Sequence, residues 1–177
     1  MKKLLLLAII FLQTYLSAQN KTGHAFFTGS LSTTFGINQN YKLSEEGNGP
    51  FIVPKSVLIR TGFGYQFNKR WTSSINAGYD HHFSYAINSI PLYGSLRYNF
   101  ITNNSDAYFI EGSYGQMFRL STEFSNGDYY KIGLGMLSIS SNRWNGVLRL
   151  DFHRKKITNF RNGNLDSISI GIGFSFH

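Results

Sequence analysis

The end of the chain alternates strictly between two kinds of residue. From residue 168 to 176, in the stretch ISIGIGFSF, isoleucine or phenylalanine occupies every second position and serine or glycine fills the positions between. Side chains of an extended strand point alternately to its two faces, so this stretch predicts a strand with one apolar and one small polar face. An α-helix would scatter the same residues around its surface.

The same alternation recurs in seven earlier segments, and no helical period of similar strength competes with it. The segments span about residues 27–37, 57–67, 71–80, 90–100, 108–115, 131–136 and 144–153. The segment at 108–115 fits least well, because Phe109 falls on its polar side. The sequence therefore predicts eight antiparallel strands.

The connections between these segments alternate in length. Long ones cover about residues 38–54, 81–89, 118–128 and 154–164, whereas short ones cover 68–70, 102–106 and 140–143. An up-and-down barrel with both termini at one end produces this order, with short turns at the terminal end and long loops opposite. Aromatic residues gather at the short turns, as in an interfacial girdle. They are Phe67, Trp71, Phe100, Tyr108, Trp144 and Phe176.

The polar faces of the predicted strands are rich in glycine. A face exposed to water usually carries Lys, Glu and Thr, whereas the interior of an eight-stranded barrel has room only for side chains. The composition therefore favours a membrane barrel over a soluble secreted barrel or β-sandwich, which alternation alone fits equally well. The glycines are Gly62, Gly64, Gly78, Gly115, Gly133, Gly135, Gly171 and Gly173.

The first residues read as a secretory signal, and its boundaries divide the chain. Lys2 and Lys3 precede an apolar run, and a small-residue cleavage site ends at Ala18. We expect residues 1–18 to be removed and residues 19–177 to form one domain. With no cysteine, lipid attachment through cysteine and disulfides are excluded. Removing Lys2 and Lys3 lowers the net charge from +8 to +6, and a basic secreted chain more often meets anionic lipid or polysaccharide than nucleic acid.

Two stretches carry a resemblance to a known family. The segment IPLYGSLRYNF (90–100) and the ending GIGFSF (171–176) are similar to the small eight-stranded outer-membrane barrels of the OmpA and OmpX type, and more closely to compact barrel-domain proteins of Bacteroidetes-like bacteria. The resemblance implies an all-β, eight-stranded antiparallel up-and-down transmembrane β-barrel. It also implies a monomer in the cell outer membrane with periplasmic termini.

The ending itself resembles the terminal insertion signal of such barrels. A polar residue, Gly171, Phe174 and Phe176 supply the pattern, although the chain closes on His177 rather than on an aromatic residue. The resemblance implies that Gly171, Phe174 and Phe176 are read by the barrel-assembly machinery.

Charged residues also fall on the polar face of the predicted strands. Enclosed charges must pair, because an isolated buried charge costs many kcal/mol. We therefore predict a salt-bridged polar network that closes the lumen; the alternative is a set of pairs that exchange partners to gate a thin water path. The predicted network comprises Arg60, Asp80, Arg97, Glu111, Lys131, Arg149 and Asp151.

The last long connection is basic. Arg154, Lys155, Lys156 and Arg161 lie in RKKITNFR. They form either a solvated loop or a contact for the phosphates of lipopolysaccharide.

Catalytic and metal-binding patterns are weak. His81 and His82 are adjacent and point to opposite faces of a strand, so they cannot share one ion without a bend. Lipid A deacylases place a serine two residues from their histidine, and no serine lies at that distance after His153. Outer-membrane palmitoyltransferases use His, Asp and Ser, but Asp80, His82 and Ser84 do not have a recognisable spacing. We assign no catalytic residue, cofactor or metal ligand.

These observations predict a non-enzymatic outer-membrane barrel with an envelope-structural or surface-interaction role. Its partners are outer-membrane lipid, lipopolysaccharide and the barrel-assembly machinery, with no nucleic acid. The alternatives are a lipid A-modifying enzyme, a soluble secreted barrel that binds a ligand, and a minor channel, although eight strands leave little lumen.

Overall fold

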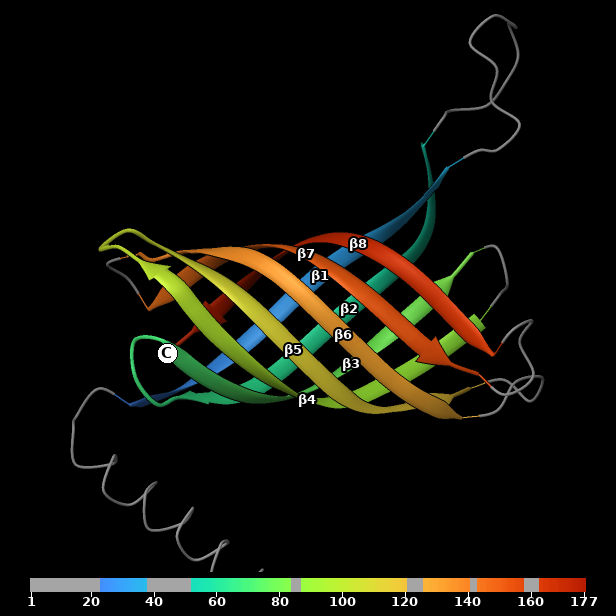
Figure 1. The fold of residues 1–177 in the computed structure, drawn as a ribbon, viewed down its shortest axis with the longest axis horizontal. Coiled ribbons are helices and arrows are strands. Elements are labelled where there is room, and N and C mark those ends of the chain that lie inside the picture. Colours follow the sequence, from blue (N-terminus) through green and yellow to red (C-terminus); the bar gives the residue numbers. More distant parts are fainter. Residues whose placement is uncertain (1–22, 38–51, 84–86, 121–125, 141–142, 158–162) are drawn as a thin grey trace, which may run out of the picture.

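Eight antiparallel strands close into one barrel in the computed structural model, which describes residues 23–37, 52–83, 87–120, 126–140, 143–157 and 163–177. Each strand pairs with its neighbours in sequence, and β1 pairs with β8 to close the wall (Figure 1). The predicted eight-stranded up-and-down barrel is confirmed. The strands are β1 (His24–Ile37), β2 (Ile52–Gln66), β3 (Trp71–His82), β4 (Ile87–Thr102), β5 (Asp106–Arg119), β6 (Gly127–Ser138), β7 (Trp144–Lys156) and β8 (Asn164–Phe176).

The strands connect by short turns at the end of the barrel where the C-terminus lies (Figure 1), which we call the turn end. The opposite end, called the loop end, carries three longer connections, between β1 and β2, β5 and β6, and β7 and β8. The predicted long connection at 81–89 is wrong, because β3 reaches His82 and β4 already begins at Ile87. The predicted signal segment 1–18 lies outside the described residues. No helix among the described residues is long and apolar enough to cross a membrane.

Several strands extend further toward the loop end than the alternation indicates. β2 begins at Ile52, β4 begins at Ile87, and β7 continues to Lys156, which pairs with Asn164 of β8. The regular contrast between an apolar and a polar face is lost in these extensions, as in the run Arg154-Lys155-Lys156 of β7, although the hydrogen-bonded ladder continues.

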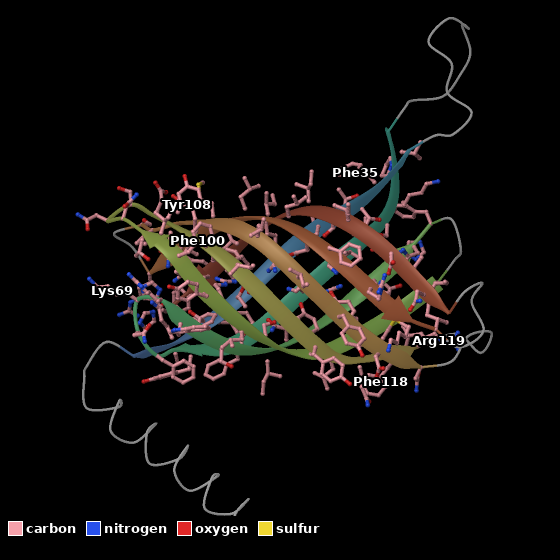
Figure 2. The ribbon with its side chains drawn as sticks, viewed as in Figure 1. Phe35, Lys69, Phe100, Tyr108, Phe118 and Arg119 are labelled. Atoms are coloured by element: carbon pink, nitrogen blue, oxygen red, sulfur yellow. The ribbon has the colours of Figure 1, made fainter. Side chains whose placement is uncertain are left out.

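The outside of the wall is apolar on every strand. Large apolar side chains point outward from all eight strands, and the most exposed are Ile75 at 70%, Ile172 at 64% and Phe63 at 63%. Phe100 and Tyr108 lie near the turn end and Phe118 lies near the loop end (Figure 2). The exposed band is far larger than the scattered apolar residues of a soluble monomer.

The inside of the wall is polar, and glycines make room for the few aromatic rings it holds. Phe109 is fully buried inside the barrel, although its neighbours in sequence follow the alternation. It pairs with Gly135 of β6, where a Cβ atom would collide with its ring. The ring that weakened the sequence pattern of β5 is therefore accommodated by a glycine on the next strand.

Candidate functional site: the charged barrel interior

A carboxylate at mid-barrel gathers three cations, which together with Asp151 we call the Glu111 cluster. Arg97 Nε and Nη2 donate to Glu111 Oε2 at 3.0 and 2.8 Å. Lys131 Nζ and Arg149 Nη2 each lie 2.7 Å from Glu111 Oε1. The Arg149 side chain also donates from Nε to Asp151 Oδ2 at 2.6 Å. Four neighbouring strands, β4 to β7, are thereby tied together across the lumen.

A second group of charges lies around Asp80 and forms the Asp80 cluster. Arg60 Nη1 pairs with Asp80 Oδ1, and Lys155 Nζ lies 2.5 Å from Asp80 Oδ2. The ammonium group of Lys155 also donates to His82 Nε2 at 2.7 Å. Asp80 is fully buried and Lys155 is nearly so. This cluster joins β2 and β3 to β7, a strand that is distant in the sequence and does not pair with either of them.

A buried histidine adds a chain of neutral hydrogen bonds. His153 Nδ1 lies 2.7 Å from the hydroxyl of Tyr129, and His153 Nε2 lies 2.7 Å from Ser169 Oγ. All three side chains are buried. A histidine held between two hydroxyl groups resembles part of a catalytic dyad, but the fully buried Ser169 offers no route to a substrate, and so the arrangement serves the packing of the lumen.

Aromatic rings complete the interior. The Arg97 guanidinium lies over the ring of Phe109, 4.0 Å from its centroid, and Lys131 Nζ lies 5.0 Å from the centroid of Tyr93. Tyr93 in turn packs against Tyr129 with centroids 4.9 Å apart. Such contacts favour a cation in a desolvated place.

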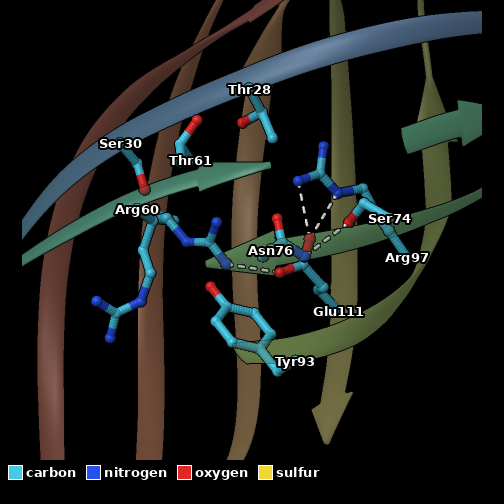
Figure 3. A pocket seen from close by; sticks show the side chains of 10 residues that line it. Thr28, Ser30, Arg60, Thr61, Ser74, Asn76, Tyr93, Arg97 and Glu111 are labelled. Atoms are coloured by element: carbon cyan, nitrogen blue, oxygen red, sulfur yellow. Dashed lines mark hydrogen bonds and ion pairs between the residues drawn. The ribbon is translucent and has the colours of Figure 1, made fainter. Parts of the chain in front are cut away.

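Side chains fill most of the lumen. Two cavities of about 10 Å³ each lie among the charged residues, and each has room for one water-sized species. Figure 3 shows side chains that line the first of them. A wider vestibule of about 430 Å³ opens at the turn end, lined by Lys69, Arg70, Asn99 and His177 among others. The charged centre therefore separates this vestibule from the loop end, with no continuous wide path through the described side chains.

The structure places all seven residues of the predicted lumen network inside the barrel. Arg97, Glu111, Lys131, Arg149 and Asp151 form one cluster, whereas Arg60 and Asp80 belong to the other. The predicted network lacks Lys155, His82 and Tyr129. Lys155 pairs with Asp80, His82 accepts a hydrogen bond from Lys155, and Tyr129 is hydrogen-bonded to His153. Continuing the alternation of β7 past Asp151 and His153 would have placed Lys155 inside as well.

The basic loop needs a correction. Residues 154–156 are part of β7 rather than a loop, and Lys155 is buried against Asp80. The prediction that Lys155 contacts lipopolysaccharide is therefore wrong in position, because alternation along the strand turns it inward. Arg154 and Lys156 do point outward, and Arg161 lies outside the described residues.

Arg154 forms a salt bridge with Asp166 above the apolar band. Its Nε and Nη2 donate to the two carboxylate oxygens of Asp166 at 2.8 and 2.7 Å. The outward residues that precede this level are apolar, namely Phe152 on β7 and Ile168 on β8. The hydrogen bond from Arg154 holds the pKa of Asp166 below its usual value.

The residues of the predicted insertion signal lie on both faces of β8. Phe174 points outward and packs on Trp144, with centroids 5.1 Å apart, and Phe176 packs on the same ring at 4.8 Å. Gly171 faces inward, where a Cβ would collide with Ser32. The terminal His177 donates its backbone N–H to the carbonyl of Arg143 at 3.1 Å.

The residues considered for catalysis do not assemble on the outer wall. Asp80, His82 and His153 are buried inside, whereas Ser84 is not among the described residues. Within the described ranges, no group of three or more His, Cys, Asp or Glu side chains could hold a metal ion.

No protein-family model and no curated protein matches the sequence. Several solved structures share the fold. Neisserial surface protein A (NspA) superposes with a TM-score of 0.66 at 8% identity, covering 88% of this chain and 99% of its own. The N-terminal β-barrel domain of Pseudomonas aeruginosa OprF gives a TM-score of 0.55 at 13% identity, covering 88% and 100%. The fold is therefore that of the small outer-membrane β-barrels.

Proposed function

We propose that the protein is an integral outer-membrane β-barrel with a closed, salt-bridged lumen and a non-enzymatic role in envelope structure or surface interaction. The observation that carries this proposal is the apolar outer face of a barrel that has no open edge. In lipid, every backbone polar group must be paired within the protein, and a closed barrel meets that condition. A soluble barrel would instead expose such a face to water at great cost.

Cationic side chains lie beyond both ends of the apolar band, so the proposed orientation rests on the connections. Lys69 and Arg70 lie beyond the aromatic residues of the turn end, and Arg154 and Lys156 lie beyond Phe152 at the loop end. Bacterial barrels place short turns in the periplasm and long loops outside the cell. The loop end is thus the cell surface in this proposal, and the termini are periplasmic.

Cell fractionation combined with gel migration tests the location. We expect the protein in the outer-membrane fraction, soluble only with detergent, and migrating differently before and after heating because the folded barrel resists unheated sodium dodecyl sulfate. A protein that is released from cells and remains soluble without detergent would overturn the proposal and favour a secreted barrel.

The orientation has its own test, which uses the absence of cysteine from the sequence. In intact cells, a membrane-impermeant maleimide should label Lys156→Cys, whereas Asn104→Cys in a short turn should react only after the outer membrane is permeabilised. The reverse pattern would show that the barrel is inserted the other way round.

A contact with lipopolysaccharide is the partner that the loop end supports. Lys156 and Arg154 point outward just past the apolar band, at the level where lipid phosphates meet water. Replacing Arg154, Lys156 and Arg161 together with Gln should reduce the lipopolysaccharide that copurifies with the barrel. The matched control replaces Lys69 and Arg70 at the turn end; equal retention in both variants would remove this partner.

The packed lumen favours a structural role over the two other candidates. A channel needs a water path, and the described interior offers two separate water-sized cavities between charged side chains. A lipid A-modifying enzyme needs its catalytic groups on the outer wall, where Asp80, His82 and His153 do not lie. Discrete conductance in planar bilayers, or a changed lipid A mass on expression, would each reverse this choice.

A further inference from the structure

The charges enclosed in the barrel do not balance. Among the residues that the structure describes, five cationic side chains inside the barrel face three carboxylates, a formal excess of two positive charges with histidine neutral. The cations are Arg60, Arg97, Lys131, Arg149 and Lys155, and the carboxylates are Asp80, Glu111 and Asp151. Each cation lies against a carboxylate. Excess charge of one sign in a desolvated place is costly unless a counter-charge joins it.

The excess is divided between the two clusters. The Glu111 cluster holds three cations and two carboxylates, and the Asp80 cluster holds two cations and one carboxylate. Each cluster therefore carries one uncompensated positive charge. One anion could interact with both clusters only at the place where they meet.

The two cavities lie at this meeting place. Both are lined by Arg60 of the Asp80 cluster and by Arg149 of the Glu111 cluster, together with Ser30 and Tyr93. Figure 3 shows Arg60 on the side of the first cavity opposite Arg97 and Glu111. A small ion here has the Arg60 and Arg149 guanidinium groups among its neighbours, with the hydroxyl of Ser30, the strand residue paired with Arg60, as a further donor. A carboxylate also lines each cavity, Glu111 in the first and Asp151 in the second.

Arg60 also has donors to spare. Its side chain is 8% exposed, and its Nη1 serves Asp80 and the backbone carbonyl of Ile59 at 2.9 Å. Its Nε and Nη2 are buried and have no hydrogen-bond partner among the described residues. Buried N–H groups of this kind need an acceptor, and an anion satisfies them better than a neutral group.

We propose that the barrel interior binds one monatomic anion of the halide class, such as chloride, between Arg60 and Arg149. The size of the cavities excludes phosphate, sulfate and carboxylic acids, because each holds only about one water-sized species. The bound anion neutralises part of the enclosed charge and joins the two clusters into one network. The folded barrel would bind this anion in any location. A negative result for the anion would therefore leave the proposed membrane location untouched, and a soluble location would leave the anion site untouched.

Two measurements on the full-length folded protein in detergent test the site. Crystals grown in sodium bromide, measured at the bromine absorption edge, should show an anomalous peak between Arg60 and Arg149. At constant ionic strength, the midpoint of thermal unfolding should rise and then saturate as chloride replaces gluconate, which is too large for the cavity. A cavity without bromide signal, occupied by water, overturns the proposal whatever the melting curves show.

A pair of variants at one position separates charge from shape. Ser30→Asp places a carboxylate in the cavity, and Ser30→Asn places a neutral group of nearly the same shape there. In gluconate, Ser30→Asp should melt above Ser30→Asn and should no longer respond to chloride. Equal midpoints for the two variants would contradict the need for a negative charge. The outward variant Arg154→Gln should keep the full chloride response of the unchanged protein.

Discussion

Two arginine–carboxylate pairs with hydrogen bonds of similar length lie in different surroundings in this barrel. Arg97 donates twice to Glu111 at 3.0 and 2.8 Å inside the lumen, and Arg154 donates twice to Asp166 at 2.8 and 2.7 Å on the outer surface. The side chains of the first pair are 11% and 4% exposed, whereas those of the second are 47% and 41% exposed. Burial, not bond length, therefore distinguishes the two.

The two pairs should contribute differently to the stability of the barrel. An exposed pair exchanges readily with water and is screened by salt, so its loss is tolerated. A buried carboxylate that serves three cations cannot be removed without leaving charges unpaired. The following variants test this difference between buried and exposed pairs, beginning with the one expected to lose the most stability.

Glu111→Gln should cause the greatest loss of stability. The substitution keeps the size of the side chain but removes the charge shared by Arg97, Lys131 and Arg149. We expect the free energy of unfolding to fall by about 3–5 kcal/mol, the usual cost of breaking a buried ion pair. Denaturant unfolding in micelles measures it. A loss near that of a surface pair would mean that water reaches Glu111.

Lys155→Met and Lys156→Met test neighbouring residues on opposite faces of β7. Lys155 is buried against Asp80, whereas Lys156 is exposed. The first change leaves Asp80 with Arg60 alone, and we expect it to lower the free energy of unfolding by about 1–3 kcal/mol. The second should have no measurable effect. Equal losses would contradict the inward placement of Lys155.

Asp166→Asn should have the smallest effect, and a pH dependence reveals its origin. The hydrogen bond from Arg154 holds the pKa of Asp166 below its usual value, so this carboxylate stabilises the fold above its ordinary pKa. The contribution disappears as the pH falls through the lowered value. Unfolding midpoints of variant and unchanged protein should therefore differ slightly at neutral pH and converge in acid; a difference that persists in acid would assign the effect to packing.

The sequence predicts the faces of this barrel well but not the pairing of its charges. Ile170 and Gly171 differ so strongly in polarity that alternation alone separates outside from inside. At Arg154, Lys155 and Lys156 that contrast is absent, because three charged residues follow one another, and the strand was mistaken for a loop. The sharing of Asp80 between Arg60 and Lys155 depends on how β2, β3 and β7 meet across the lumen. Barrel closure sets this arrangement, and no local pattern in the sequence encodes it.

Quenching by lipid tests most directly the central claim that the wall separates lipid from a polar interior. Single cysteines can be placed at successive positions of β7 through Val147→Cys, Leu148→Cys, Arg149→Cys and Leu150→Cys, and labelled with a small fluorophore in vesicles that contain brominated lipid. We expect strong quenching at the outward positions 148 and 150 and little at the inward positions 147 and 149. Equal quenching by lipid at inward and outward positions would contradict the separation of lipid from the polar interior. Quenching of all four positions by a water-soluble agent alone would contradict it as well.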